Sequence, residues 1–250
     1  MNNEKILDQN GKSWDIIADD WFGVTALPTY GPFTPKEDEL NLFEDVSGKY
    51  VLDIGCGSGH SLCYMGEKGA SELWGIDISS TQIKSAKDVL NKSGYSQKLF
   101  VSPMENNPGI PLNYFDIVYS IYALGWTIDL EKTINMISNY LKPGGIFVFS
   151  WDNPLMQCLE TKDDKIFFNR SYMEEELINM KKGGQPMSLY NWKLSTYINA
   201  LSNAGMKVER LIEKADTETI NNAADFSEKY YSDFKAKIIP MSFIIKAIKL

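Results

Sequence analysis

The alternation of short apolar runs with amphipathic segments between residues 50 and 150 constrains the fold of this chain more than any other feature. Each apolar run has the length of a buried strand, and each amphipathic segment repeats apolar side chains at helical spacing. Strands that alternate with helices in this way form parallel sheets with crossover connections. The expected strands lie at 50–54, 73–77, 99–101, 115–120 and 146–150.

The helices expected between these strands have recognisable ends. One runs over about 58–68 and stops at Gly69, and another follows Ser79, which forms a capping box with Gln82. A third helix carries an apolar stripe and ends before the Pro-Gly-Gly sequence at 143–145. These ends agree with a repeated strand–helix unit.

The regular alternation of strands and helices ends after residue 150. Residues 151–190 are polar and irregular, with an expected hairpin near 165–172, and regular structure returns with a helix around Leu194–Leu201 and strands at 206–211 and 242–249. About 30 residues separate the last two strands, which favours an antiparallel return of the final strand. The expected fold is therefore a single α/β domain over residues 1–250. It is Rossmann-like, with a seven-stranded, mostly parallel sheet, an antiparallel last strand and helices on both faces.

Two irregular regions are candidates for a lid. The first, residues 1–46, holds helical pieces near 13–22 and 36–45 around a turn rich in Pro and Gly. The second is the insertion at 151–190. Because long irregular connections in compact domains usually serve function, we expect both to cover a binding site.

Charge and cysteine content exclude several classes of function. The formal net charge of −8 argues against a nucleic-acid partner, because phosphate contacts need a basic face. The three cysteines match no zinc spacing, so we expect reduced thiols and no metal site. The polar N-terminus is not typical of a targeting peptide, and no apolar run approaches the ~20 residues that span a bilayer. We expect a cytoplasmic protein without a membrane partner.

The segment VLDIGCGSG at 51–59 joins the first strand to its helix. Its glycines permit a sharp turn and a close approach of backbone to ligand, and the helix start behind them favours an anionic group. A dinucleotide fingerprint would need glycine where His60 stands, and Asp53 would repel a pyrophosphate. A ligand with an ammonium group would instead suit Asp53, and Asp77, at the end of the second strand, is placed to accept from ribose hydroxyls.

With these motifs the chain resembles the class I S-adenosylmethionine-dependent methyltransferases, and among them the small-molecule group that includes quinone-biosynthesis enzymes. The resemblance rests on VLDIGCGSGH, LWGIDIS, FDIVYSIYAL and LKPGGIFVFS, within residues 48–150. It implies a seven-stranded sheet with an antiparallel last strand, S-adenosyl-L-methionine as cofactor and a small-molecule substrate. It also implies a cofactor site made of Asp53, Gly55, Cys56, Gly57, Asp77, Ile78, Met104, Glu105, Tyr119 and Ser120, with the last two near the sulfur.

Two positions depart from the family pattern. Pro103 stands where relatives often have an Asp that accepts from the adenine amino group, so Glu105, a backbone carbonyl or water must do so here. Gly125-Trp126 replaces a His pair, which removes a histidine base at that point. The only histidine, His60, follows the glycine loop, and helix-start packing is the simpler interpretation of it.

Aromatic residues are plentiful where the substrate pocket is expected. Tyr30, in a turn rich in Pro and Gly, is the favoured pocket residue, and Trp21, Tyr122 and Trp126 are the others. Core packing is the alternative for each. No catalytic residue stands out, and the weak candidates are Tyr30 and Asp152, which follows the fifth strand and would otherwise cap or turn the chain.

Methyl transfer to a small molecule is thus the expected function, with the acceptor atom unspecified. An NAD-dependent oxidoreductase is one alternative, against which Asp53 and His60 count. A non-catalytic, cofactor-binding regulatory protein is another, because Pro103 and the missing His pair depart from the family. A protein or RNA methyltransferase is disfavoured by the acidic charge. The sequence indicates no oligomeric state.

Overall fold

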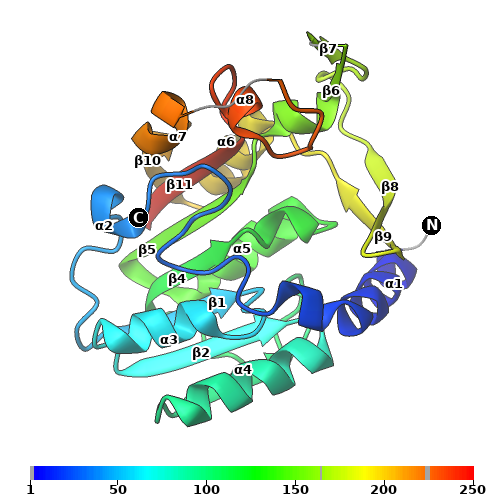
Figure 1. The fold of residues 1–250 in the computed structure, drawn as a ribbon. Helices are drawn as coiled ribbons and strands as arrows, with labels where there is room; N and C mark the ends of the chain where they lie inside the picture. Colours follow the sequence, from blue (N-terminus) through cyan, green and yellow to red (C-terminus); the bar gives the residue numbers. More distant parts are fainter. Residues whose placement is uncertain (1–2, 164, 223–225) are drawn as a thin grey trace.

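A seven-stranded sheet in the order β10-β11-β5-β4-β1-β2-β3 forms the centre of the computed structural model, which describes residues 3–163, 165–222 and 226–250 (Figure 1). Residues 1–2 of the expected N-terminal lid and residue 164 of the expected insertion lie outside the described residues. The strands of the sheet are β1 (Tyr50–Ile54), β2 (Glu72–Asp77), β3 (Gln97–Val101), β4 (Phe115–Ile121), β5 (Leu141–Asp152), β10 (Met206–Ile212) and β11 (Ser242–Lys249).

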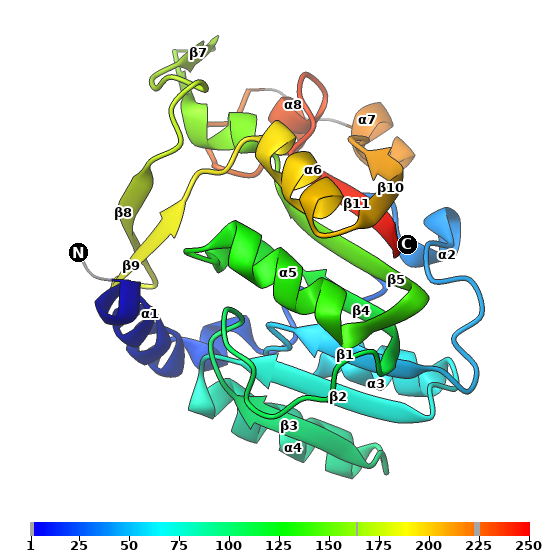
Figure 2. The ribbon, with the colours of Figure 1, turned by 180° about the vertical axis from the view of Figure 1, so that it is seen from behind.

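Helices cover both faces of this sheet, as expected. Helices α3 and α4 lie against one face and α5 and α6 against the other (Figures 1 and 2). The helices are α1 (Asn3–Ile16), α2 (Glu37–Leu40), α3 (His60–Glu67), α4 (Ser80–Lys92), α5 (Leu130–Tyr140), α6 (Leu194–Asn203), α7 (Thr217–Asn222) and α8 (Asp233–Ala236), with short 3-10 turns at Ala18–Trp21, Leu124–Trp126 and Pro154–Cys158. No helix in the described part of the chain is long and apolar enough to cross a membrane.

The strand directions confirm the expected topology. Strand β1 pairs in parallel with β2 and β4, and β4 pairs in parallel with β5. Strand β11 alone runs against its neighbours, antiparallel to both β5 and β10. The carboxyl ends of β1, β2, β4 and β5 therefore meet at one edge of the sheet, where open α/β folds bind their ligands.

Local signals set the helix starts, with one difference from expectation. Ser79 caps α4, since its Oγ accepts from the backbone N–H of Gln82 at 3.1 Å. The Gln82 side chain does not complete the capping box, because the Ser79 N–H donates to Asp77 Oδ1 at 2.9 Å, and Gln82 Nε2 donates to the carbonyl of Ala18 at 3.4 Å. The Gln82 side chain, which the sequence assigns to the start of α4, thus bonds to the N-terminal segment.

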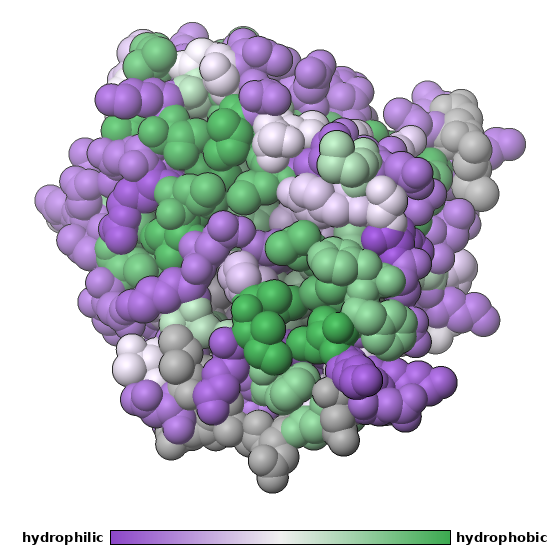
Figure 3. Space-filling model, turned by 90° about the horizontal axis from the view of Figure 1, so that it is seen from above, coloured by the Kyte–Doolittle hydropathy of each residue, from purple (hydrophilic) through white to green (hydrophobic). Residues whose placement is uncertain are grey.

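Two apolar clusters hold the sheet between its helices. One contains Phe115, Phe147 and Phe149 and packs against α5 and α6, and the other contains Val51, Leu62 and Met65 and packs against α3. Some apolar side chains also reach the surface, where they gather in patches among polar ones on the face seen in Figure 3. Such patches are normal for a folded domain of this size.

The two expected lid regions contact each other. The insertion forms a small hairpin, β6 (Leu159–Lys162) with β7 (Lys165–Phe168), and a longer one, β8 (Leu177–Lys182) with β9 (Gln185–Tyr190). Helix α1 packs along β9 (Figure 1). The side chain of Asn10 donates to the Ser188 carbonyl at 2.7 Å and accepts from the Ser188 N–H at 2.9 Å. Two segments distant in sequence are therefore joined by packing and hydrogen bonds.

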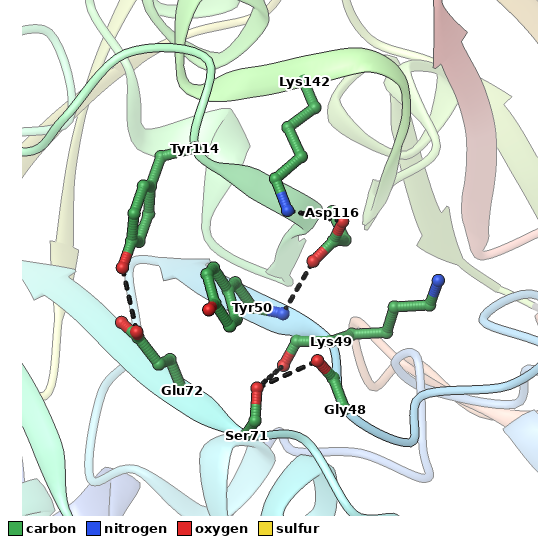
Figure 4. Close-up of polar contacts among 8 residues, drawn as sticks. All are labelled: Gly48, Lys49, Tyr50, Ser71, Glu72, Tyr114, Asp116 and Lys142. Carbon is green, nitrogen blue, oxygen red and sulfur yellow. Dashed lines mark hydrogen bonds and ion pairs between the residues drawn. The ribbon is translucent and has the colours of Figure 1, made fainter.

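A polar cluster joins the amino ends of the strands, opposite the ligand-binding edge (Figure 4). Asp116 accepts from the backbone N–H of Tyr50 at 2.9 Å and from Lys142 Nζ at 2.8 Å. Partial burial raises the pKa of Asp116, but the hydrogen bonds from Lys142 and the Tyr50 N–H outweigh it, so the pKa lies below its ordinary value. The ionised form is thus favoured in the folded state.

We expect Asp116→Asn to lower the free energy of unfolding at neutral pH by about 1 kcal/mol. Because the folded-state pKa is depressed, this contribution is present above the unfolded pKa and is lost as the pH falls through the folded-state value. Urea unfolding of both proteins from pH 7 down to pH 2 measures it, and the difference between them should shrink toward zero. A difference that stays constant with pH would contradict the expectation.

Candidate cofactor and acceptor site

A cavity of about 520 Å³ lies at the carboxyl ends of the strands. One end is lined by the glycine loop after β1 and by the end of β2. The other end is lined by residues that follow β4 and β5, by α1 and by strand β8. The cavity therefore has two ends with different linings.

The glycine loop is built for close backbone approach. Gly55 has φ +76°, and a Cβ at this position would lie 2.4 Å from the Cβ of Ala123. Side chains other than glycine rarely adopt this φ, and here they would also clash. The turn therefore keeps the backbone of Gly55, Cys56 and Gly57 at the wall of the cavity.

Asp77 connects the end of β2 to the glycine loop. Its carboxylate accepts from the backbone N–H of Gly57 and from that of Ser79, each at 2.9 Å. Burial raises the pKa of Asp77 to about 6, and the two backbone N–H groups oppose this rise. Asp77 lines the cavity, and Ile78 lies beside it. The carboxylate is therefore held in one orientation toward a ligand with hydroxyl donors.

Asp53 is a second buried carboxylate at this end, only 2% exposed. Burial and then the charge of Asp77 raise the pKa of Asp53 well above its ordinary value. No Lys, Arg or His in the described ranges forms an ion pair with it. A ligand that brings an ammonium group to Asp53 would supply the missing positive charge.

Two buried side-chain oxygens along the same wall have no hydrogen-bond partner within the described structure: Gln82 Oε1 and Glu105 Oε2. The other oxygen of Glu105 accepts from Thr127 Oγ1 and from the backbone N–H of Ile128. Met104 and Glu105 both line the cavity. Because buried polar atoms are normally paired, these two oxygens favour a ligand with N–H or O–H donors.

Tyr119 and Ser120 do not lie where the family resemblance implies. Both are fully buried and neither lines the cavity. Ser120 Oγ donates to the Ile54 carbonyl at 2.8 Å, and Tyr119 packs within the apolar cluster on the α3 side. We correct the expectation for both: along β4 they support β1 from inside the sheet, because the strand reaches the cavity only at its end, from Ile121 onward.

Aromatic walls enclose the other end of the cavity, which we call the acceptor chamber; its rings are Trp14, Trp21, Tyr122, Trp126 and Trp151. Trp14 meets Trp21 and Trp126 edge to face, with ring centroids 5.9 and 5.2 Å apart. A side chain at position 125 would clash with its neighbour, since a Cβ on Gly125 would lie 1.8 Å from Trp151 Cε2. The missing side chain at position 125 thus makes room for the Trp151 ring.

Asp152, at the end of β5, lies in this chamber among tyrosine hydroxyls. Tyr122 and Tyr231 donate to its Oδ1 at 2.6 and 2.7 Å, and Tyr230 donates to Oδ2 at 3.4 Å. Burial raises the pKa of Asp152 in spite of these donors. The alternative that Asp152 caps a turn is wrong, because its neighbour Asn153 is the cap, accepting from the Leu155 N–H.

Tyr230 and Tyr231 were missed by sequence reasoning. They precede α8, far from any recognised motif, and the only signal was a Tyr-Tyr pair in a polar stretch. Lys182, on β8, also lines the chamber and was not singled out. Which of two successive lysines faces inward depends on the β8–β9 register, which local sequence does not determine.

Tyr30 requires the second correction. It is fully buried, does not line the cavity, and donates to Glu37 Oε2 at 2.6 Å. Glu37 in turn accepts from the backbone N–H groups of Leu42 and Phe43, so the turn is folded onto the apolar cluster beneath it. A turn rich in Pro and Gly therefore does contribute a core side chain. Trp21, Tyr122 and Trp126 line the cavity, and their role in a substrate pocket stays a prediction.

His60 lines the cavity beside the glycine loop. Its Nδ1 lies 3.0 Å from Ser58 Oγ, and its ring meets Phe22 edge to face. Burial lowers the pKa of His60, so the neutral form is favoured. These contacts agree with a packing role at the start of α3.

Comparison with known proteins agrees with this geometry. Residues 52–149 match the family described as a methyltransferase domain. An uncharacterized protein of Haemophilus influenzae is 28% identical over 190 residues, which are 71% of this chain and 75% of that protein. The aklanonic acid methyltransferase DauC of Streptomyces sp. strain C5 is 31% identical over 149 residues, which are 58% of this chain and 63% of that enzyme.

A solved structure shares the fold. The S-adenosylmethionine dependent methyltransferase from Mesorhizobium loti has a TM-score of 0.70 and 21% identity, and the match covers 84% of this chain and 95% of that one. At this identity the likeness concerns the fold alone. The chain spans only 28–33% of the length of three further curated relatives.

The match of residues 52–149 to a methyltransferase domain, together with the fold, indicates an S-adenosylmethionine-dependent methyltransferase. The residues present fit that cofactor. Asp53 lacks a positive partner, Asp77 is held toward the cavity, and Gln82 and Glu105 leave oxygens unpaired.

Proposed function

We propose that this enzyme methylates a small organic molecule held in the acceptor chamber, as in the small-molecule group that includes quinone-biosynthesis enzymes. The observation that carries the proposal is that one continuous cavity of about 520 Å³ runs from the glycine loop to Asp152. Its volume lies within the range of small-molecule sites. Trp14 and Lys182 line it from α1 and β8, which would together cover the cavity and restrict the approach of a macromolecule. The cytoplasmic location stays a prediction from sequence.

The cofactor end would be held by the residues that line it. Asp53 would accept from the amino group of the methionine part, and Asp77 from the ribose hydroxyls. Glu105 Oε2 would accept from the adenine amino group in place of the Asp that Pro103 replaces, because this oxygen is buried and unpaired. When bound, S-adenosylmethionine supplies an electrophilic methyl group on a sulfonium.

The chamber would align the acceptor and exclude water. Its aromatic rings offer an apolar surface and faces that attract positive charge, so they suit both a flat acceptor and a nearby sulfonium. Orientation of the two reactants is the protein's main contribution to such a displacement and is worth ~7–11 kcal/mol. The chamber would hold the acceptor atom in line with the methyl group that the cofactor supplies when bound.

Asp152 would take the proton of an acceptor that arrives as O–H or N–H. Its raised pKa brings the carboxyl nearer to neutral pH, where a general base works best. Oδ2 is the oxygen available, since only Tyr230 donates to it, at 3.4 Å, whereas Oδ1 accepts from two tyrosines.

The proposal is tested with radiolabelled S-adenosylmethionine and a cell extract split into dialysable and macromolecular fractions. We expect label in a dialysable product. Label confined to protein or RNA would overturn the small-molecule proposal, and no label anywhere, with cofactor binding intact, would favour a non-catalytic role.

Once the acceptor is found, Asp152→Asn tests the base. We expect turnover to fall by about 10²-fold with little change in KM, because the amide keeps the shape but cannot accept a proton. Asn153→Ala, next along the chain, is the control for damage to the end of β5. Full turnover by Asp152→Asn would show that Asp152 is not the base.

A further inference from the structure

Among the described residues, Lys182 is the one Lys or Arg that lines the acceptor chamber, and its surroundings are unusual for a lysine. Nζ of Lys182 lies 4.0 Å from the centre of the Trp21 ring and 5.6 Å from that of Trp126. The side chain is partly buried, and burial lowers the pKa of the ammonium group, while the charge of Asp152 opposes this. The lysine thus enters the cavity between tryptophan faces.

No described residue forms a hydrogen bond or an ion pair with the Lys182 ammonium group. The eight ion pairs of the described structure all involve other residues. Tryptophan faces attract a cation but replace only part of the hydration that it loses. A partly buried cation without a hydrogen-bonded anion is therefore a position where an anionic ligand is favoured.

Asp152 does not fill this role. Its carboxylate already accepts from Tyr122, Tyr230 and Tyr231, so its charge is stabilised by three hydroxyls. It acts on Lys182 only through the longer-range attraction between the two charges. The chamber thus has a compensated negative charge and an incompletely compensated positive one.

We infer that the acceptor carries a carboxylate and that Lys182 binds it. This rests on the proposed function and names the substrate class of the same chamber. A carboxylate fits better than a phosphate, because Lys182 is the only Lys or Arg that lines the cavity in the described part of the chain. A single ammonium group matches one negative charge, whereas a phosphate dianion usually gathers several donors. The aromatic walls indicate that the rest of the acceptor is flat and apolar.

The experiment compares two matched probes, the naphthoate anion and the neutral naphthamide. Their binding is measured by calorimetry to the full chain saturated with S-adenosylhomocysteine. We expect wild type to bind naphthoate about tenfold more tightly than naphthamide. Lys182→Met should abolish this preference by weakening naphthoate alone, and Lys182→Arg should keep it.

Lys181→Met is the matched control. Lys181 is the neighbouring residue on β8 and is exposed. Its replacement changes the net charge by the same amount as Lys182→Met but leaves the cation of the chamber in place. We expect it to retain the preference. Unchanged S-adenosylhomocysteine affinity in each variant shows that the fold is intact.

Two results would overturn the inference: equal binding of both probes to wild type, or a preference for naphthoate that survives Lys182→Met. If Lys182→Met fails to fold, Lys182→Gln replaces it with the same expected loss. These outcomes are independent of the labelling screen. A preference for the anion without any methylated product would contradict the proposed function and leave the anion site supported.

Discussion

Asp77→Ala should weaken the binding of S-adenosylhomocysteine by about 2–4 kcal/mol, which is roughly a thirty- to thousandfold rise in Kd. The buried carboxylate is held by the backbone N–H groups of Gly57 and Ser79 and points into the cavity. Its loss would leave the ribose hydroxyls without an acceptor and would loosen the glycine loop. Calorimetric titration measures the change.

The control for this change is Asp88→Ala, an exposed position on helix α4, which follows β2, and this variant should bind as wild type does. The wild-type affinity should also fall as the pH drops through about 6, the pKa of Asp77 in the free protein, because a protonated carboxyl has lost acceptor capacity. Near-wild-type affinity in a folded Asp77→Ala variant would remove Asp77 from the cofactor site.

Removing residues 1–16 should lower turnover by at least about a hundredfold while leaving a cooperatively folded protein. This truncation deletes α1, and with it Trp14 from the chamber wall and Asn10 from its contacts with Ser188. The chamber would then open to water and lose its alignment of the acceptor. Turnover of the identified acceptor and urea unfolding are the two measurements.

A longer truncation, of residues 1–30, serves as the contrast. It also removes Leu27 and Tyr30, which are 5% and 0% exposed and belong to the apolar cluster on the α3 side. Losing large core side chains costs about 2–5 kcal/mol each, so this variant should unfold or be strongly destabilised. Full turnover by the shorter variant would contradict a covering role for α1, and a stable longer variant would contradict the place of Tyr30 in the core.

The strand order and the cofactor end followed closely from local sequence. The segment around Gly55 needs a positive φ next to a buried strand, and Asp77 ends the next strand, so both meet at the same edge of a parallel sheet. A regular repeat of strand and helix leaves few ways to connect them. This is why the positions of Asp53 and Gly57 along the cavity could be predicted from local sequence, whereas the position of Glu105 was expected only from the family resemblance.

Expectations failed where a side chain's surroundings come from distant segments. Tyr119 stands at a motif position that the family resemblance assigns to the cofactor site. Because β4 lies in the middle of the sheet, the Tyr119 side chain is instead buried in the core. Tyr30 lies in a turn, yet its hydroxyl is bound by Glu37 after the turn folds inward. Neither outcome depends on local propensity, which is the only quantity that a single sequence reports.

The sequence alone determined the topology of the sheet, the glycine loop and the carboxylates beside it, because each depends on neighbouring residues and a repeated unit. Only the tertiary structure decided the acceptor chamber. Trp14, Trp126, Lys182, Asp152 and Tyr231 come from five separate segments, and their meeting depends on how α1, the β8–β9 hairpin and the end of β5 pack together. Side chains of opposite charge and aromatic rings acquire a shared function only when packing brings them within a few ångströms, and no local pattern encodes that proximity.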